Sequence, residues 1–181
     1  MSSEFWEKVL PDIVSDGLKI LFVGFNPGMQ SAREGHHYAG ASNRFWRLLH
    51  ESGLTPYRLS PGEDRKLLDY GYGSTNIANR PTRQAGELTA EELAEGCSSL
   101  TGLISQIRPE IVCHVGIGVY RIFKSQMEKI PKNRLKVTTG LQSWNLIDGV
   151  KDYVCSNPSG LNTIPYCSQL DCFKALMRII I

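Results

Sequence analysis

The stretch that decides the fold reads LKILFVGFNPG and spans residues 18–28 of the 181-residue chain. Its apolar first part predicts a buried strand over residues 18–24, and the following Gly-Phe-Asn-Pro-Gly predicts a tight turn. Because ligands bind at the carboxyl ends of strands in open α/β sheets, Asn26 is expected at the mouth of a site. Pro27 restricts Asn26 to an extended conformation, and Gly28 lets the backbone approach a flat ligand closely.

Strand and helix patterns alternate along the rest of the chain. Further strands are expected at residues 73–78, 111–115, 144–147 and 152–155. Helices are expected over residues 42–52 with Ser42 as N-cap, from the capping box of Thr89 and Glu92 to a stop at Pro109, from residue 119 onward, and over 169–181. This βαβα order predicts an α/β fold, a three-layer αβα sandwich with a central, mainly parallel sheet of about four strands. We expect a single domain over residues 1–181.

Composition narrows the class of protein. The formal net charge of +2 permits nucleic-acid binding through a local patch but does not require it. The five cysteines include no Cys-x-x-Cys pair, so we expect buried free thiols and neither a zinc site nor an iron–sulfur cluster. The first ten residues lack an apolar signal core, and no apolar run is long enough to cross a membrane. We therefore expect an intracellular, soluble protein.

Two strands end in nearly the same sequence. Asn26-Pro27-Gly28 follows the first, and Asn157-Pro158-Ser159-Gly160 follows the last. Either alone is an ordinary turn, since Asn-Pro and Pro-Gly are common turn dipeptides. Both would open at the carboxyl edge of one sheet, however, so we expect them to face each other across a single cleft.

Several motifs, in this order, resemble those of the mismatch-specific uracil/thymine DNA glycosylases, a branch of the uracil-DNA glycosylase superfamily. They are Gly24-Phe25-Asn26-Pro27-Gly28, Gly35-His36-His37-Tyr38, Asn43-Arg44-Phe45-Trp46, Thr75-Asn76 with Arg80-Pro81-Thr82, and Asn157-Pro158-Ser159-Gly160-Leu161. The resemblance covers nearly the whole chain and implies a uracil-DNA glycosylase-like fold.

The resemblance implies a monofunctional DNA N-glycosylase that needs no cofactor or metal. Such an enzyme flips uracil out of mispairs with guanine and excises it hydrolytically, leaving an abasic site. Ethenocytosine and, more weakly, thymine are implied as further substrates. The expected partner is double-stranded DNA with a damaged or mismatched base, and we expect a monomer. It would be cytoplasmic, associated with the nucleoid in a bacterium, or nuclear in a eukaryote.

The resemblance also implies roles for individual residues. Asn26 would hold the attacking water as the catalytic residue, with Thr82 in support. The implied base-binding residues are Phe25, Gly28, Ser31, His37, Tyr38 and Asn76. The implied DNA-binding and wedge residues are Ser42, Asn43, Arg44, Asn157, Pro158, Ser159, Gly160, Leu161 and Asn162. Lys132, Arg134 and Lys136 are further candidates for phosphate contacts.

Structural roles are the alternative for several of these residues. Tyr38 and Leu161 could instead be buried structural residues, and His37 could be an ordinary surface histidine. The Thr82 hydroxyl could simply cap the backbone of its own loop. For the whole protein, one alternative is a superfamily glycosylase acting on hypoxanthine or alkylated bases. Another is a flavodoxin-like nucleotide-binding domain with Gly116-Ile117-Gly118 as its phosphate loop, although this motif lacks the third glycine of a dinucleotide-binding loop and the Lys-Ser/Thr of a P-loop.

Overall fold

A five-stranded sheet runs through the middle of the molecule, with its strands in the order β2-β1-β3-β5-β4. The computed structural model describes residues 9–180. The first four strands in this order pair in parallel, and β4 pairs antiparallel with β5. The strands are β1 (Ile20–Gly24), β2 (Tyr72–Asn76), β3 (Ile111–Val115), β4 (Gly140–Leu141) and β5 (Lys151–Cys155).

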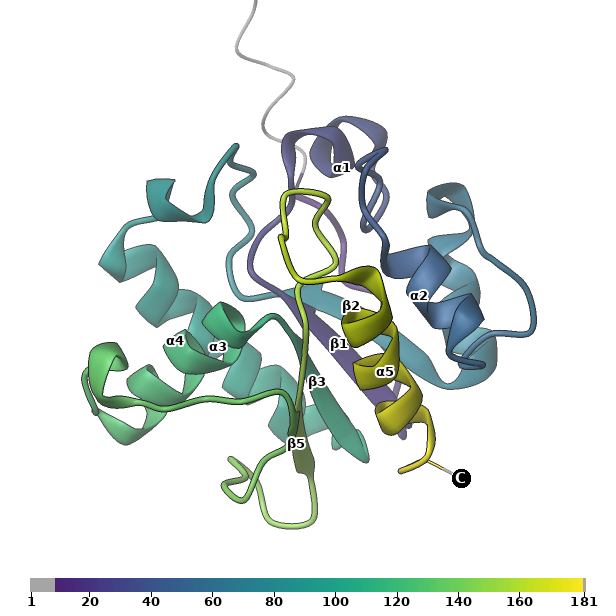
Figure 1. The fold of residues 1–181 in the computed structure, drawn as a ribbon. Helices are drawn as coiled ribbons and strands as arrows, with labels where there is room; N and C mark the ends of the chain where they lie inside the picture. The colour runs from purple at the N-terminus through teal and green to yellow at the C-terminus, as the bar shows by residue number, and fades with distance from the viewer. Residues whose placement is uncertain (1–8, 181) are drawn as a thin grey trace, which may run out of the picture.

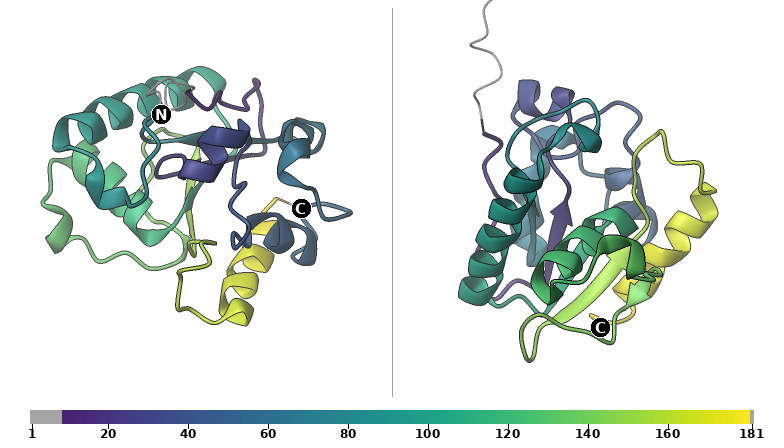
Figure 2. Two further views of the ribbon diagram at one scale, coloured as in Figure 1. Left: turned by 90° about the horizontal axis from the view of Figure 1, so that it is seen from above. Right: turned by 90° about the vertical axis from the view of Figure 1, so that its left-hand side faces the viewer.

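Helices cover both faces of this sheet and complete the three-layer sandwich that the sequence predicts (Figures 1 and 2). One face packs against α3 and α4, and the other against α2, η2 and α5. The α-helices are α1 (Met29–Glu34), α2 (Phe45–Glu51), α3 (Ala90–Ile107), α4 (Ile117–Glu128) and α5 (Tyr166–Met177). The 3-10 helices are η2 (Pro61–Tyr70), η3 (Ala85–Glu87) and η4 (Lys132–Arg134).

The opening apolar stretch forms the centre of the sheet because β1 is buried along its whole length. Successive side chains of a strand point to opposite faces. Ile20 and Phe22 therefore join the core beneath α2 and α5, whereas Leu21 and Val23 join the core beneath α3 and α4. A strand that is buried on both faces contributes side chains to two cores and therefore has a continuous apolar sequence, as β1 does.

The boundaries of α3 follow the local signals. The Thr89 hydroxyl accepts a hydrogen bond from Glu92 N at 3.2 Å, and the Glu92 carboxylate accepts one from Thr89 N at 2.7 Å. This capping box fixes the start of the helix. The helix ends at Ile107, where Arg108 adopts a left-handed conformation just before Pro109.

Two sequence predictions about secondary structure are wrong. Residues 144–147 form no strand, because side chains and not a ladder hold this segment: Asp152 Oδ2 accepts from Leu146 N and Asn145 Oδ1 accepts from Asp152 N. The antiparallel edge strand is β4 instead. Ser42 does not cap α2, which starts at Phe45, where Asn43 Oδ1 accepts from Phe45 N at 2.9 Å.

Further features differ from the sequence predictions or agree with them only in part. Neither α1 nor η2 was expected, although Ser60 and Glu63 form a capping box at the start of η2. Cys97, Cys113 and Cys155 are buried free thiols, whereas Cys167 is exposed. The C-terminal helix, expected over residues 169–181, runs from Tyr166 to Met177. Residues 1–8, which make up most of the N-terminal stretch judged to lack a signal core, and Ile181 fall outside the described residues. No helix among residues 9–180 is long and apolar enough to cross a membrane.

Candidate active site

A cavity of about 750 Å³ opens at the carboxyl edge of the sheet and contains both Asn-Pro loops. The loop after β1 with α1, and the loop after β5, lie together at the top of Figure 1. The predicted residues that line it are Phe25, Asn26, Gly28, Ser31, His37, Tyr38, Asn43, Asn76, Asn157, Pro158, Ser159, Leu161 and Asn162. Ser42, Arg44, Thr82 and Gly160 do not line it.

The Asn26 side chain has a fixed orientation. Its Nδ2 donates to the Arg80 carbonyl at 2.9 Å and to Thr82 Oγ1 at 2.7 Å. Because a carbonyl can only accept, the atom facing Arg80 must be the amide nitrogen. The remaining atom, Oδ1, has no donor among the described residues, so the amide presents an acceptor to a ligand in the cavity.

Thr82 provides one of the two hydrogen bonds that orient the Asn26 side chain. Its side chain is buried, and its hydroxyl accepts from Asn26 Nδ2 and donates to the Gln84 carbonyl at 2.9 Å. The hydroxyl proton is therefore engaged within the loop, which is the structural role that the sequence also allowed. Any support that Thr82 gives to a water passes through the Asn26 amide.

Tyr38 lines the cavity with a ring that is backed by a second ring. It stacks on Phe45 with centroids 3.7 Å apart and planes inclined by 18°. Its backbone is left-handed, with φ of 53°, which is uncommon outside glycine. Burial raises the pKa of the Tyr38 phenol well above its ordinary value, so the ring is neutral. Phe45 thus supports Tyr38 as a platform.

His37 is buried, unlike the surface histidine that the sequence allowed as the alternative. Its Nε2 lies 3.0 Å from the Pro11 carbonyl and its Nδ1 lies 2.9 Å from Ser74 Oγ. Since the Pro11 carbonyl can only accept, Nε2 carries the proton. Burial lowers the pKa of His37, which favours the neutral ring. Both ring nitrogens are therefore occupied within the fold.

Two glycines shape the floor of the cavity. A Cβ built at Gly28 would meet no atom within 4 Å, so the space in front of its backbone is open. At Gly24 a Cβ would come within 2.4 Å of Asn76 Oδ1, so the strand end needs glycine to admit the Asn76 amide. Gly24 is paired with Asn76 in the ladder. The Asn76 amide makes no hydrogen bond to another described residue and is available to a ligand.

Ser31 and the end of β3 form further walls. Ser31 is buried on α1, and its hydroxyl accepts from Ala39 N at 3.0 Å. The Gly116–Gly118 segment, expected from its sequence only as the phosphate loop of the alternative fold, lines the same cavity. Gly116 has φ of 130°, a conformation that favours glycine. A glycine directly after a buried strand was the available signal.

The loop after β5 is held rigidly and exposes one apolar side chain. Asn157 Oδ1 accepts from Ser159 N at 2.9 Å, and Asn162 Nδ2 donates to the Asn157 carbonyl at 2.6 Å. Leu161 is 89% exposed at its tip, which rules out the alternative of a buried leucine. The Leu161 side chain is therefore free to contact a ligand or partner at the rim of the cavity.

The Asn43 segment supports this loop from its other side. Arg44 N donates to the Pro158 carbonyl at 2.9 Å, and a side chain at Gly160 would clash with Ser42. Ser42, Arg44 and Gly160 therefore build the rim and do not line the cavity. Lys132, Arg134 and Lys136 follow α4, on a loop at the lower left of Figure 1, away from the cavity at the top.

Apart from Arg83, the described residues that line the cavity are uncharged, and none is Asp or Glu. No group of three His, Cys, Asp or Glu residues within 9–180 is placed to hold a metal ion. The site therefore offers amides, backbone groups and aromatic faces to a ligand.

Comparisons with known proteins identify the fold and the family of the chain. The solution NMR structure of a Methanosarcina acetivorans protein assigned as a uracil DNA glycosylase matches with a TM-score of 0.64 at 18% sequence identity. The match covers 94% of this chain and 96% of that chain, and it establishes the shared fold. The profile of the Uracil DNA glycosylase superfamily matches residues 11–180. The chain therefore belongs to the uracil DNA glycosylase superfamily.

Proposed function

We propose that this protein is a monofunctional DNA glycosylase of the mismatch-specific branch, which excises uracil from mispairs with guanine in double-stranded DNA. The observation that carries the proposal is the orientation of the Asn26 amide. Two hydrogen bonds hold its Nδ2, so that Oδ1 is free to accept from a ligand in a cavity whose described lining contains no carboxylate. The motif resemblance supports this branch, and superfamily membership supports the reaction class.

In the proposed reaction, the bond between the sugar C1′ and the base nitrogen breaks with its electron pair leaving on the base. Positive charge develops on the sugar, and water then bonds to C1′ while its proton passes to the base or to solvent. Asn26 Oδ1 accepts a hydrogen bond from this water and orients it. Because an amide is not a general base at neutral pH, bond breaking runs ahead of water attack.

The departing base would be stabilised by neutral donors. The backbone N–H groups of Gly28 and Tyr38 have no acceptor among the described residues, and Asn76 lines the same cavity. Donors aimed at the base oxygens stabilise the charge that develops as the bond breaks. The Tyr38 ring, backed by Phe45, gives the flipped base a stacking surface.

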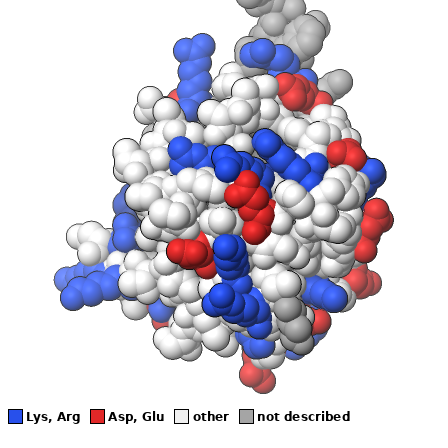
Figure 3. Space-filling view, turned by 45° about the vertical axis from the view of Figure 1, so that its right-hand side comes forward, with Lys and Arg blue, Asp and Glu red and all other residues white. Residues whose placement is uncertain are grey.

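Leu161 would act as the wedge that fills the space left by the flipped nucleotide. Inserting an apolar side chain offsets part of the unstacking cost, which is a few kcal/mol. Lysine and arginine side chains gather on the face shown in Figure 3, with some acidic side chains between them. Such a face can contact DNA phosphates, and the strength of binding should fall with salt.

The preferred lesion is uracil in this proposal, because Ser31 would lie against the 5-position of the base. Its hydroxyl leaves less apolar room for the thymine methyl group, and ethenocytosine would also be accepted. Thr163 stands where bacterial members of the branch often carry arginine, so dependence on the opposite guanine would be relaxed.

The test is release of base from labelled duplexes that contain G·U, G·T, A·U, hypoxanthine or an alkylated base, with EDTA present. We expect uracil release from G·U without added metal or nucleotide, and loss of that release in Asn26→Ala with duplex binding retained. Near wild-type cleavage by Asn26→Ala would remove Asn26 from the mechanism. Preference for hypoxanthine or an alkylated base would favour the alternative specificity.

A further inference from the structure

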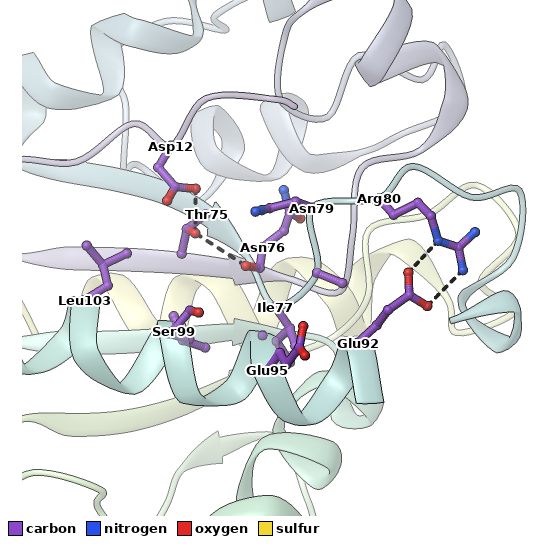
Figure 4. A pocket seen from close by; sticks show the side chains of 13 residues that line it. Asp12, Thr75, Asn76, Ile77, Asn79, Arg80, Glu92, Glu95, Ser99 and Leu103 are labelled. Atoms are coloured by element: carbon purple, nitrogen blue, oxygen red, sulfur yellow. Dashed lines mark hydrogen bonds and ion pairs between the residues drawn. The ribbon is translucent and has the colours of Figure 1, made fainter. Parts of the chain in front are cut away.

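Arg80 connects the candidate active site to the start of α3. Its side chain forms a fork on Glu92, with Nε 2.5 Å from Oε1 and Nη2 3.0 Å from Oε2 (Figure 4). The same Nη2 donates to the Glu87 carbonyl at 2.7 Å. This arrangement ties the loop after β2 to the first turn of the helix.

The main chain of Arg80 faces the opposite way, toward Asn26. Its carbonyl accepts from Asn26 Nδ2 at 2.9 Å. On either side of Arg80, Ala78 N donates to the Phe25 carbonyl and Thr82 N donates to the Pro27 carbonyl. The loop therefore runs beside the Phe25–Pro27 segment, and its middle residue gives Asn26 an acceptor while its side chain is anchored outside.

The ion pair is too exposed to matter much for folding. The side chains of Arg80 and Glu92 are 48% and 30% exposed, and exposed ion pairs contribute little to stability. A bidentate guanidinium–carboxylate fork nonetheless fixes geometry. The Arg80 guanidinium and the Thr89 N–H lower the pKa of Glu92 to about 2, so the carboxylate is ionised at neutral pH.

We propose that Arg80 and Glu92 are positioning residues, whose fork holds the Arg80 carbonyl against Asn26 and keeps Asn26 Oδ1 aimed at the attacking water. This inference rests on the proposed glycosylase function. It assigns an effect on the rate of base release to a charge pair that does not line the cavity. Because a displacement of about 1 Å in a reacting group can cost up to about a hundredfold, a loosened loop should be visible in the rate.

The principal variant is Glu92→Gln, which removes the charge of the fork but retains a side chain that suits the capping box. Glu95→Gln is the matched control, because Glu95 lies one turn along the same helix and forms no ion pair with another described residue. Thr89→Ala removes only the N-cap hydroxyl of α3 and shows the effect of losing that cap. Arg80→Gln removes the other partner of the ion pair, and it is the test variant if Glu92→Gln fails to fold.

Each protein is assayed for single-turnover uracil release from a G·U duplex, for binding to a duplex carrying 2′-fluorinated deoxyuridine, and for Tm. We expect Glu92→Gln and Arg80→Gln to slow release by about five- to thirtyfold, with binding and Tm close to those of Glu95→Gln. The double variant should be no slower than the slower single variant, because both remove one interaction.

Equal rates for Glu92→Gln and Glu95→Gln, with an active wild type, would overturn the inference and leave the proposed function standing. A rate loss matched by Thr89→Ala, or accompanied by equal loss of binding and Tm, would assign the pair a structural role and overturn it as well. Absence of uracil release by the wild-type protein would instead overturn the proposed function, and the inference with it.

Discussion

Replacing Thr82 with valine removes one of the two hydrogen bonds that orient Asn26 and leaves the other in place. Valine has nearly the shape of threonine but cannot accept from Asn26 Nδ2 or donate to the Gln84 carbonyl, which now lie 2.7 and 2.9 Å from the hydroxyl. The Arg80 carbonyl remains as the second acceptor for Asn26. Thr82→Ser keeps the hydroxyl and is the matched control.

The expected loss of stability is small. Gln84 is exposed and Asn26 borders the cavity, so water can satisfy the groups that valine leaves unpaired. The cost in unfolding free energy should therefore be close to that of one net hydrogen bond, about 1 kcal/mol. For a chain of this length that corresponds to a Tm lower by about 2–4 °C.

The expected loss of rate is larger. With one anchor removed, the amide can turn about its remaining hydrogen bond, and Oδ1 spends less time on the attacking water. We expect single-turnover uracil release to fall by about ten- to a hundredfold, equivalent to about 1.4–2.7 kcal/mol in the activation barrier. Thr82→Ser should stay within about threefold of the wild type, because it restores both hydrogen bonds.

The assay uses enzyme in excess over a labelled G·U duplex, with urea unfolding measured on the same preparations. A Thr82→Val protein that releases uracil at the wild-type rate would refute the claim that this hydroxyl orients Asn26. Equal slowing in Thr82→Ser would refute it too, since the cause would then lie outside the hydroxyl.

Three further predictions concern the wedge, the base pocket and pH. Leu161→Ala should slow release more at a G·C-flanked site than at a loosely stacked one, and equal, unimpaired rates on both duplexes would show that Leu161 has no wedge role. The wild type should process G·U faster than G·T by about ten- to two-hundredfold, and Ser31→Ala should narrow this gap; equal wild-type rates would remove Ser31 from base selection. Because burial lowers the pKa of His37 below 6.5, the unfolded state binds a proton more readily below that pH, so the free energy of unfolding should decrease on acidification. Urea unfolding between about pH 5 and 7 should show a weaker decrease in His37→Gln, and an unchanged slope would contradict this linkage.

Local chemistry determined much of the fold. The continuous apolar run of β1 predicted a strand buried on both faces, because a central strand must supply both cores. The Thr89 capping box and Pro109 marked the two ends of α3, since both act within a single helical turn. The position of Asn26 and Asn157 directly after parallel strands also predicted one shared cavity, which both residues line.

Residue patterns gave a wrong prediction where side-chain hydrogen bonds or packing compete with the regular structure. Residues 144–147 have the apolar pattern of a strand, yet Asp152 and Asn145 hold that segment through their side chains. Ser42 has the right identity for an N-cap, but it packs against Gly160 and leaves the capping contact to Asn43. The partner of Ser42 is distant in the sequence, whereas residues 144–147 are held by side-chain hydrogen bonds between residues six and seven positions apart.

The sequence by itself therefore determined the four parallel strands, the sheet edge that carries the site, and most of the residues that line the cavity. Only the tertiary structure decided how those residues are oriented. The hydrogen bonds that fix Asn26 join residues 54 and 56 positions apart, and those that engage the His37 ring nitrogens come from residues 26 and 37 positions away. No periodicity or local motif encodes such pairings, because they exist only once the sheet brings its loops together.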